Sequence, residues 1–157
     1  MPIVLTRIDD RLIHGQITEG WSKSLKTELI VVVSDDVVSS DWEKELCLAA
    51  LPSNIEGMVV SIDEAPEIIN KLVSDPRNSY VIFETPHDAY TAHKKGARIH
   101  DINVGGMHSS KNKREILDYI FVDEEDTKYL KALNNSGITL DFRDMPNNVN
   151  VNVLSQL

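Results

Sequence analysis

The chain is poor in cysteine, in basic residues and in long apolar segments, and each scarcity excludes a class of protein. Cys47 is the one cysteine among 157 residues, so neither an internal disulfide nor a thiolate metal site can form. The 16 Lys and Arg are outnumbered by 25 Asp and Glu, which gives a formal net charge of −9. That balance disfavours nucleic acid and anionic membrane surfaces as partners, because both attract basic proteins. The longest apolar run lies around 29–33 and is far too short to span a bilayer.

What the chain does contain is typical of a globular protein. Apolar residues make up 41% and charged residues 26% of the sequence. No linker or repeat divides it, and its length suits one domain, so we expect a single domain over 1–157. The first residues, MPIVLT, lack the basic, apolar and small-residue regions of a secretion signal. The sequence therefore predicts a cytoplasmic protein.

Short β-branched runs alternate with amphipathic segments along the chain. The runs that predict strands are 3–8, 28–34, 58–62, 80–83, 99–104, 119–122 and 138–142. Helices are predicted between them, with starts near Gln16, Ser40, Asp63, Thr85 and Asp123. This alternation predicts an α/β fold whose sheet is parallel in its first part, with the direction of the later strands left open.

The segment that follows the first predicted strand is the richest in side chains that can bind a ligand or react. The stretch 7–16 (RIDDRLIHGQ) places arginines, aspartates and a histidine at a strand end, where open α/β sheets bind ligands. The helix expected after it presents unpaired N–H groups, which favour a phosphate. Neutral imidazole is nucleophilic near pH 7, so His14 can accept a phosphoryl group whose charge Arg11 neutralises. The alternative is a surface loop in which Asp9 or Asp10 caps the helix and His14 only forms hydrogen bonds.

Two segments resemble those of a known family. RIDDRLIHGQ looks like the phosphorylation-site signature of the IIB components of the mannose/fructose/sorbose family of the bacterial sugar phosphotransferase system (PTS). NVGGMH (103–108) is similar to a second stretch of that family, and the resemblance extends from about residue 5 to residue 144. It implies a free-standing IIB domain of three layers, with a mixed, mainly parallel sheet of about seven strands flanked by helices.

The resemblance also implies a function. His14 corresponds to the phosphoryl-carrying histidine of the family, with Nδ1 as the acceptor atom, and Arg11 to its phosphate-stabilising arginine. A IIB component takes the phosphoryl group from a phosphohistidine on its IIA partner and passes it to a sugar held by the membrane components IIC and IID. The chain is thus expected to be a phosphotransferase with a covalent phosphohistidine intermediate. A hexose or N-acetylhexosamine is the expected final acceptor, and no metal or cofactor is needed.

Neighbouring residues are expected to assist the transfer. Asp10 is expected to orient Arg11 or the imidazole, although Asp9 is open to the same role and either acid can simply cap the helix. Gly15 and Gln16 are expected to offer backbone N–H groups to the phosphate.

The second segment is expected to lie beside the first. Gly105 and Gly106 permit a close approach of the backbone to the phosphate, or else form a plain turn after a strand. Thr85 and His108 are expected at the rim of the same site. His108 is open to contact with phosphate, sugar or partner, and equally to being a solvated loop residue.

Two other functions match parts of the sequence. A response-regulator receiver domain also has an acidic pair after its first strand (Asp9, Asp10), an aspartate after its third (Asp63) and a threonine after its fourth (Thr85). In that case Asp63 would accept the phosphoryl group and a Mg²⁺ ion would bind the acids. Asp63 also fits a helix cap, however, and no lysine ends the fifth strand. A metal-dependent hydrolase is the second rival, but no His-x-His or His-Glu-x-x-His spacing supports it.

Overall fold

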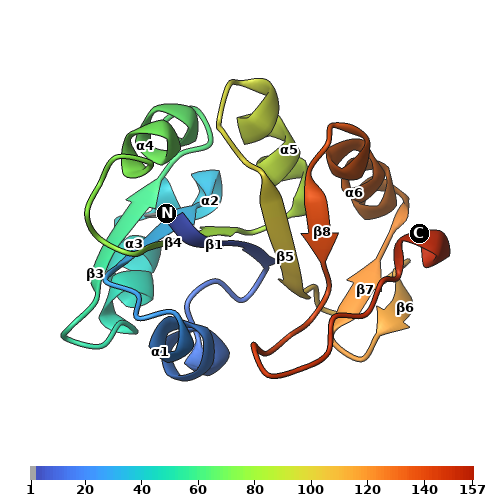
Figure 1. Cartoon of the computed structure of the whole chain (residues 1–157), viewed down its shortest axis with the longest axis horizontal. Helices are drawn as coiled ribbons and strands as arrows, with labels where there is room; N and C mark the ends of the chain where they lie inside the picture. The colour runs from blue at the N-terminus through green and yellow to red at the C-terminus, as the bar shows by residue number, and fades with distance from the viewer. Residues whose placement is uncertain (1–2) are drawn as a thin grey trace.

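The computed structural model describes residues 3–157 and consists of alternating strands and helices (Figure 1). Its strands are β1 (Ile3–Asp9), β2 (Leu29–Val33), β3 (Glu56–Val60), β4 (Ser79–Phe83), β5 (Asp101–Gly106), β6 (Arg114–Leu117), β7 (Ile120–Val122) and β8 (Thr139–Asp141). Its α-helices are α1 (Ser22–Ser24), α2 (Asp35–Val38), α3 (Asp41–Ala49), α4 (Ala65–Leu72), α5 (Pro86–Lys94) and α6 (Glu124–Asn135). A π-helix, η1 (Gln16–Trp21), precedes α1, and a 3₁₀ turn, η2 (Leu154–Gln156), lies near the end of the chain.

The strands form a parallel sheet and a separate small pair. The main sheet has six strands in the order β3-β2-β4-β1-β5-β8, and every pair within it is parallel. β6 and β7 form an antiparallel pair outside it. The predicted α/β class and mainly parallel sheet are confirmed. About seven strands were expected in the sheet, and it has six, because β7 lies outside it and pairs with β6. The strand β6 was not predicted.

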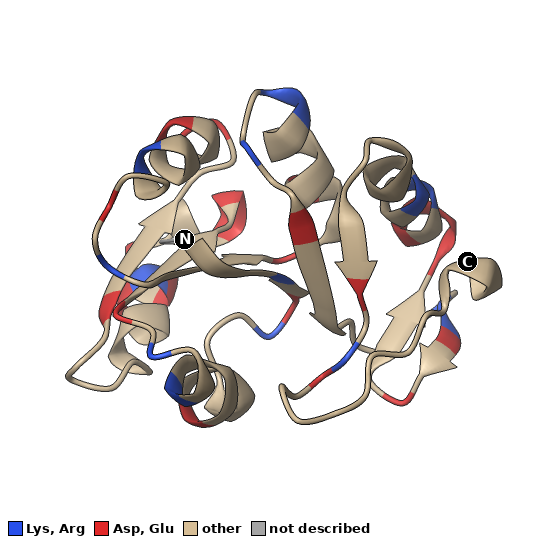
Figure 2. Cartoon of the chain, viewed as in Figure 1, with Lys and Arg blue, Asp and Glu red and all other residues tan. Residues whose placement is uncertain are grey.

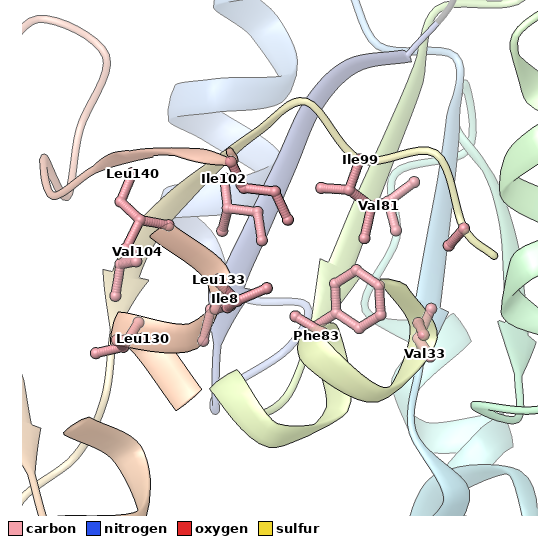
Figure 3. Close-up of a cluster of buried hydrophobic side chains, with 14 of the residues drawn as sticks. Ile8, Val33, Val81, Phe83, Ile99, Ile102, Val104, Leu130, Leu133 and Leu140 are labelled. Carbon is pink, nitrogen blue, oxygen red and sulfur yellow. The ribbon is translucent and has the colours of Figure 1, made fainter. Parts of the chain in front are cut away.

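Helices cover both faces of the sheet and make three layers. Alternate residues of β2 and β4 point to opposite faces, as the pleat of a strand requires. Val31, Val81 and Phe83 belong to the core under α4, α5 and α6, whereas Val32 and Ile82 belong to the core under η1 and α3. Figure 3 shows side chains of the first core packed between the strands and the helices α5 and α6, among them Ile8, Val33, Ile99, Ile102, Val104, Leu130, Leu133 and Leu140.

The predicted helix starts are confirmed, but one predicted helix cap is wrong. Ser40, Thr85 and Asp123 each accept a backbone N–H at the start of their helices, so they act as N-caps. Asp63 does not cap α4. Ser61 and Glu64 exchange hydrogen bonds there instead, and the exposed Asp63 pairs with Lys95 at 3.0 Å.

The central strand β1 determines where the candidate site lies. β1 runs between β4 and β5, and its carboxyl end opens into the loop that leads to η1. The loop end of β5, with Gly105 and Gly106, therefore meets the end of β1 at one edge of the sheet. Within residues 3–157, no helix is long and apolar enough to cross a membrane.

Candidate functional site

Asp9, the last residue of β1, is the centre of a network at the carboxyl edge of the sheet. Its Oδ2 accepts hydrogen bonds from His14 Nε2 at 2.8 Å and from Arg11 Nη2 at 2.9 Å. Its Oδ1 accepts from Arg11 Nε at 3.0 Å. Arg7, which lies two residues back on the same face of β1, donates to Oδ2 at 2.9 Å. The structure thus brings His14 and Arg11 together, as predicted, through a shared carboxylate.

The electrostatics of this network favour an anionic ligand. Burial of Asp9 acts to raise the pKa of its carboxyl, but hydrogen bonds from His14 and Arg11 and the charge of Arg7 hold that pKa well below the usual range. Asp9 is therefore ionised, and its single negative charge faces two guanidinium groups. The remaining positive charge is suited to a phosphoryl group, which guanidinium ions bind through charge-assisted hydrogen bonds. Figure 2 shows basic and acidic positions alternating along the end of β1 and the loop that follows.

The contacts of the His14 ring give its two nitrogens different roles. Nε2 faces the Asp9 carboxylate, which only accepts hydrogen bonds, so the proton of the neutral ring lies on Nε2. Nδ1 then carries the lone pair, and it accepts the backbone N–H of Gln16 at 3.3 Å. The side chain is 17% exposed, and Gly15 beside it is exposed to solvent. Nδ1 is therefore the basic, nucleophilic nitrogen of the ring.

The loop between β1 and η1 is sharply bent, and a hydrogen bond from one of its side chains to the first residue of η1 holds it in place. Leu12 has a φ of 60° and is nevertheless buried, a backbone conformation that non-glycine residues rarely adopt and that clusters at functional sites. The Gln16 side chain accepts a hydrogen bond from Arg11 Nη2 at 2.8 Å. This bond connects the first residue of η1 to the arginine and limits its freedom.

Arg7 is fully buried, and its hydrogen bonds connect Asp9 to two other segments of the chain. Besides Asp9, it donates from Nη1 to Asn103 Oδ1 at 2.8 Å and to the Asp144 carbonyl at 2.9 Å. The Asp144 carbonyl also accepts the Trp21 indole N–H at 2.7 Å. The loop after β8 therefore reaches across to the β1 end and to η1 (Figure 1). Sequence reasoning missed this role, although the two-residue spacing of Arg7 and Asp9 on a strand was an available signal.

Gly105 and Gly106 make room for charged side chains of β1 and its loop. A Cβ on Gly105 would overlap the guanidinium of Arg7. A Cβ on Gly106 would lie 2.7 Å from Asp9 Oδ1 and 2.9 Å from Arg11 Nη2. Both glycines therefore allow the network to pack against the backbone of β5. Their contact with phosphate stays a prediction.

Asp10 has a different partner from the one expected. Its carboxylate accepts hydrogen bonds from the His108 backbone N–H at 2.8 Å and from His108 Nδ1. The end of β1 directs Asp9 toward His14 and Arg11 and directs Asp10 toward the loop after β5, so of the two acids open to the orienting role only Asp9 contacts those side chains. His108 is thus held at the rim of the site, where it was expected.

The remaining predicted positions lie outside the network. Thr85 Oγ1 accepts the Asp88 backbone N–H at 3.1 Å and serves as the cap of α5. Asp63 follows the edge strand β3, which β2 and β4 separate from β1. A receiver-type site that combines Asp63 with the acids at the end of β1 is therefore not formed. Within residues 3–157, no group of three or more His, Cys, Asp and Glu side chains is arranged to hold a metal ion.

A second group of carboxylates lies at the ends of β2 and β4. Glu84 accepts a hydrogen bond from Ser34 Oγ at 2.8 Å. Asp88, in the first turn of α5, has a side chain only 15% exposed. Burial, followed by the negative charge of Glu84, raises the pKa of Asp88 to about 6. The folded protein therefore holds a proton on Asp88 at a pH where the unfolded chain has released it.

We expect Asp88→Asn to stabilise the protein at pH 7.5 and to have little effect at pH 4. Because the pKa of Asp88 is higher in the folded state, its contribution to stability is full below the usual aspartate pKa of 3.8 and is lost as the pH rises to about 6. Asparagine removes that loss, which is worth about 3 kcal/mol for a shift of this size. Urea unfolding at the two pH values measures the difference, with the exposed Asp118→Asn as control. An equal effect of Asp88→Asn at both pH values would contradict the assignment.

Comparison with known proteins gives a consistent answer. Residues 3–157 match the family model described as the sorbose subfamily IIB component of the PTS. The chain is 36% identical over 146 residues to the PTS fructose-specific EIIB component of Bacillus subtilis, a match that covers 93% of this chain and 90% of the relative. It is 34% identical over 143 residues to the mannose-specific EIIAB component of Escherichia coli, covering 91% of this chain and 44% of that longer protein.

A solved structure agrees with these sequences. The crystal structure of the IIBSor domain of the sorbose permease from Klebsiella pneumoniae superposes with a TM-score of 0.90 at 32% identity, covering 99% of this chain and 96% of that one. The parallel sheet and the sequence therefore indicate the same relationship. The chain belongs to the sorbose subfamily of PTS IIB components.

Proposed function

We propose that this IIB component carries a phosphoryl group on Nδ1 of His14. The observation that supports the proposal is the hydrogen bond between His14 Nε2 and the ionised Asp9, which leaves Nδ1 unprotonated at a place where Arg11 supplies positive charge. An imidazole is a suitable carrier because the N–P bond that it forms remains easily transferable.

In the proposed step, the Nδ1 lone pair attacks the phosphorus of a phosphohistidine on the IIA partner. The new N–P bond forms as the N–P bond of the donor breaks, and the donor imidazole leaves with its electron pair. Nε2 of His14 keeps its proton, so the phosphorylated ring gains positive charge and its hydrogen bond to Asp9 becomes stronger. Positioning and charge stabilisation carry the transfer, and no metal is required.

Residues around the ring have separate tasks in this proposal. Arg11 binds equatorial oxygens of the phosphoryl group, because its guanidinium is 30% exposed and is already oriented by Asp9. Gly15 and Gln16 supply backbone N–H groups, and the Gln16 N–H faces Nδ1 in the unphosphorylated ring. Gly105 and Gly106 bring the end of β5 close to the same point.

The proposed partners follow from membership of the family. The phosphoryl group arrives from a IIA component in the cytoplasm and leaves to a sugar bound by IIC and IID. Relatives are named for fructose, sorbose, mannose and N-acetylgalactosamine. We therefore propose a hexose or an N-acetylhexosamine as the sugar.

The chemistry of the bond to phosphorus tests this proposal. The protein is labelled from phosphoenolpyruvate through the general PTS proteins and a matching IIA, and the label is then exposed to acid and to alkali. A phosphohistidine loses the label in acid and keeps it in alkali. A label that is lost in alkali and to hydroxylamine, and that maps to Asp63, would overturn the proposal in favour of a receiver-type aspartyl phosphate.

Asp9→Asn is expected to slow phosphoryl acceptance by about a hundredfold or more, because an amide facing His14 no longer holds the proton on Nε2. The ¹⁵N chemical shifts of the ring report the tautomer directly and distinguish this effect from a general loss of structure. Asp10→Asn is the matched variant, since Asp10 contacts His108, and its effect is expected to be a few-fold at most. A larger effect at Asp10 than at Asp9 would return the orienting role to Asp10.

A further inference from the structure

Helix α3 carries an exposed apolar face beside the phosphoryl site. Trp42 is 71% exposed and Leu46 is 60% exposed, and their spacing of four residues places them together on one side of the helix. None of the residues of α3 is fully buried. A tryptophan and a leucine exposed side by side are characteristic of a surface that binds another protein.

An open hollow connects this face to the phosphoryl site. The hollow has a volume of about 520 Å³, and its lining includes Leu46 and Cys47 from α3 and Arg11, Leu12 and Ile13 from the loop after β1. Arg11 is the same residue whose guanidinium is held by Asp9 next to His14. A protein that covers His14 and extends along the hollow therefore reaches Leu46 and Trp42.

The charges around the hollow indicate what kind of surface fits it. Asp36, Glu43 and Glu84 line the hollow together with Arg11, and Asp41 is exposed at the start of α3. Carboxylates next to an apolar face disfavour an anionic lipid surface and favour a protein that brings Lys or Arg.

We propose that Trp42, Leu46 and the adjoining hollow form the docking surface for the phosphorylated IIA donor, an inference that rests on the proposed function. The donor carries the phosphoryl group when it arrives, and a protein that holds a phosphohistidine needs cations around it to neutralise the phosphate. Those cations complement the carboxylates of the hollow.

The test compares transfer from the donor protein with labelling by a small molecule. Trp42→Ala and Leu46→Ala are expected to lower the rate of transfer from phospho-IIA by about tenfold or more at subsaturating donor, through a higher KM. Labelling of the same variants by phosphoramidate, which needs no docking surface, is expected to match wild type. Val73→Ala is the control, because Val73 is 41% exposed but lies beside the start of β1, at the opposite edge of the sheet.

Each other outcome has a definite meaning. Transfer from phospho-IIA at the wild-type rate in both variants would overturn the inference and leave the proposed function intact. Normal transfer from phospho-IIA, with slower sugar phosphorylation in membranes that contain IIC and IID, would overturn it by assigning the surface to the acceptor. A wild-type protein that takes no phosphoryl group on His14 from either source would refute the proposed function itself, and the inference with it.

Discussion

Replacement of His14 by glutamine is expected to abolish phosphoryl acceptance and to leave the fold in place. The glutamine amide nitrogen is not a nucleophile, so no N–P bond can form. Its N–H can still donate to Asp9 as the imidazole does, so the buried carboxylate keeps this partner. Intact-mass measurement after incubation with phospho-IIA detects the phosphoryl group, and circular dichroism follows the fold.

A second histidine variant makes this result specific. His100 is exposed just before β5, at the edge of the sheet opposite the site. His100→Gln is therefore expected to accept phosphoryl as wild type does. Phosphorylation of the His14→Gln protein at the wild-type rate would contradict the assignment. A label found on His108, which Asp10 holds near the site, would identify that histidine as the carrier instead.

Gly105→Ala is expected to cause the largest loss of stability, about 3 kcal/mol or more. The new methyl group would occupy the position of the Arg7 guanidinium. Arg7 is fully buried, and its guanidinium is held by hydrogen bonds to Asp9, Asn103 and the Asp144 carbonyl. Its displacement would leave the Asp9 carboxylate without one of its cations and would also break the bond to Asn103. Urea unfolding measures the loss, and acceptance at His14 should fall with it.

Gly15→Ala is the matched control for this substitution. A Cβ at Gly15 would meet no atom within 4 Å, and the residue has an ordinary helical φ of −56°. The same change of one methyl group is therefore expected to leave stability within about 0.5 kcal/mol of wild type. Equal destabilisation by the two alanines would show that crowding of Arg7 is not the cause.

The parts of the fold that could be predicted are those with a local signal. β2 and β4 are continuous apolar runs, typical of strands covered on both faces, and Thr85 and Asp123 are side chains whose capping role is visible in the sequence itself. β6 (Arg114–Leu117) had no such signal, because it is a short strand with exposed residues that pairs only with its neighbour β7. Asp63 was misassigned because Ser61 and Glu64 offered an equally good cap three residues apart.

In the site, too, residues that lie in one motif could be predicted, whereas contacts between residues far apart in the sequence could not. His14 and Arg11 lie in one short motif, so the sequence alone was enough to name both as candidates. The choice between Asp9 and Asp10 depends on which way each side chain points at the end of β1, and the partner of Asp10 is nearly a hundred residues away, at His108. No pattern within the motif carries that information. The exposure of Trp42 is a related case, because an apolar stripe on a helix does not reveal whether the protein core or a partner covers it.

The Asp144 carbonyl, which accepts hydrogen bonds from both Arg7 and Trp21, determines when during synthesis the site can be completed. The ribosome makes this carbonyl more than a hundred residues after the motif that contains His14. Until the loop after β8 has left the exit tunnel, Arg7 lacks one of its acceptors and the indole N–H of Trp21 lacks its acceptor. A nascent chain that already displays His14 therefore lacks part of the support beneath it until the loop after β8 has emerged as well.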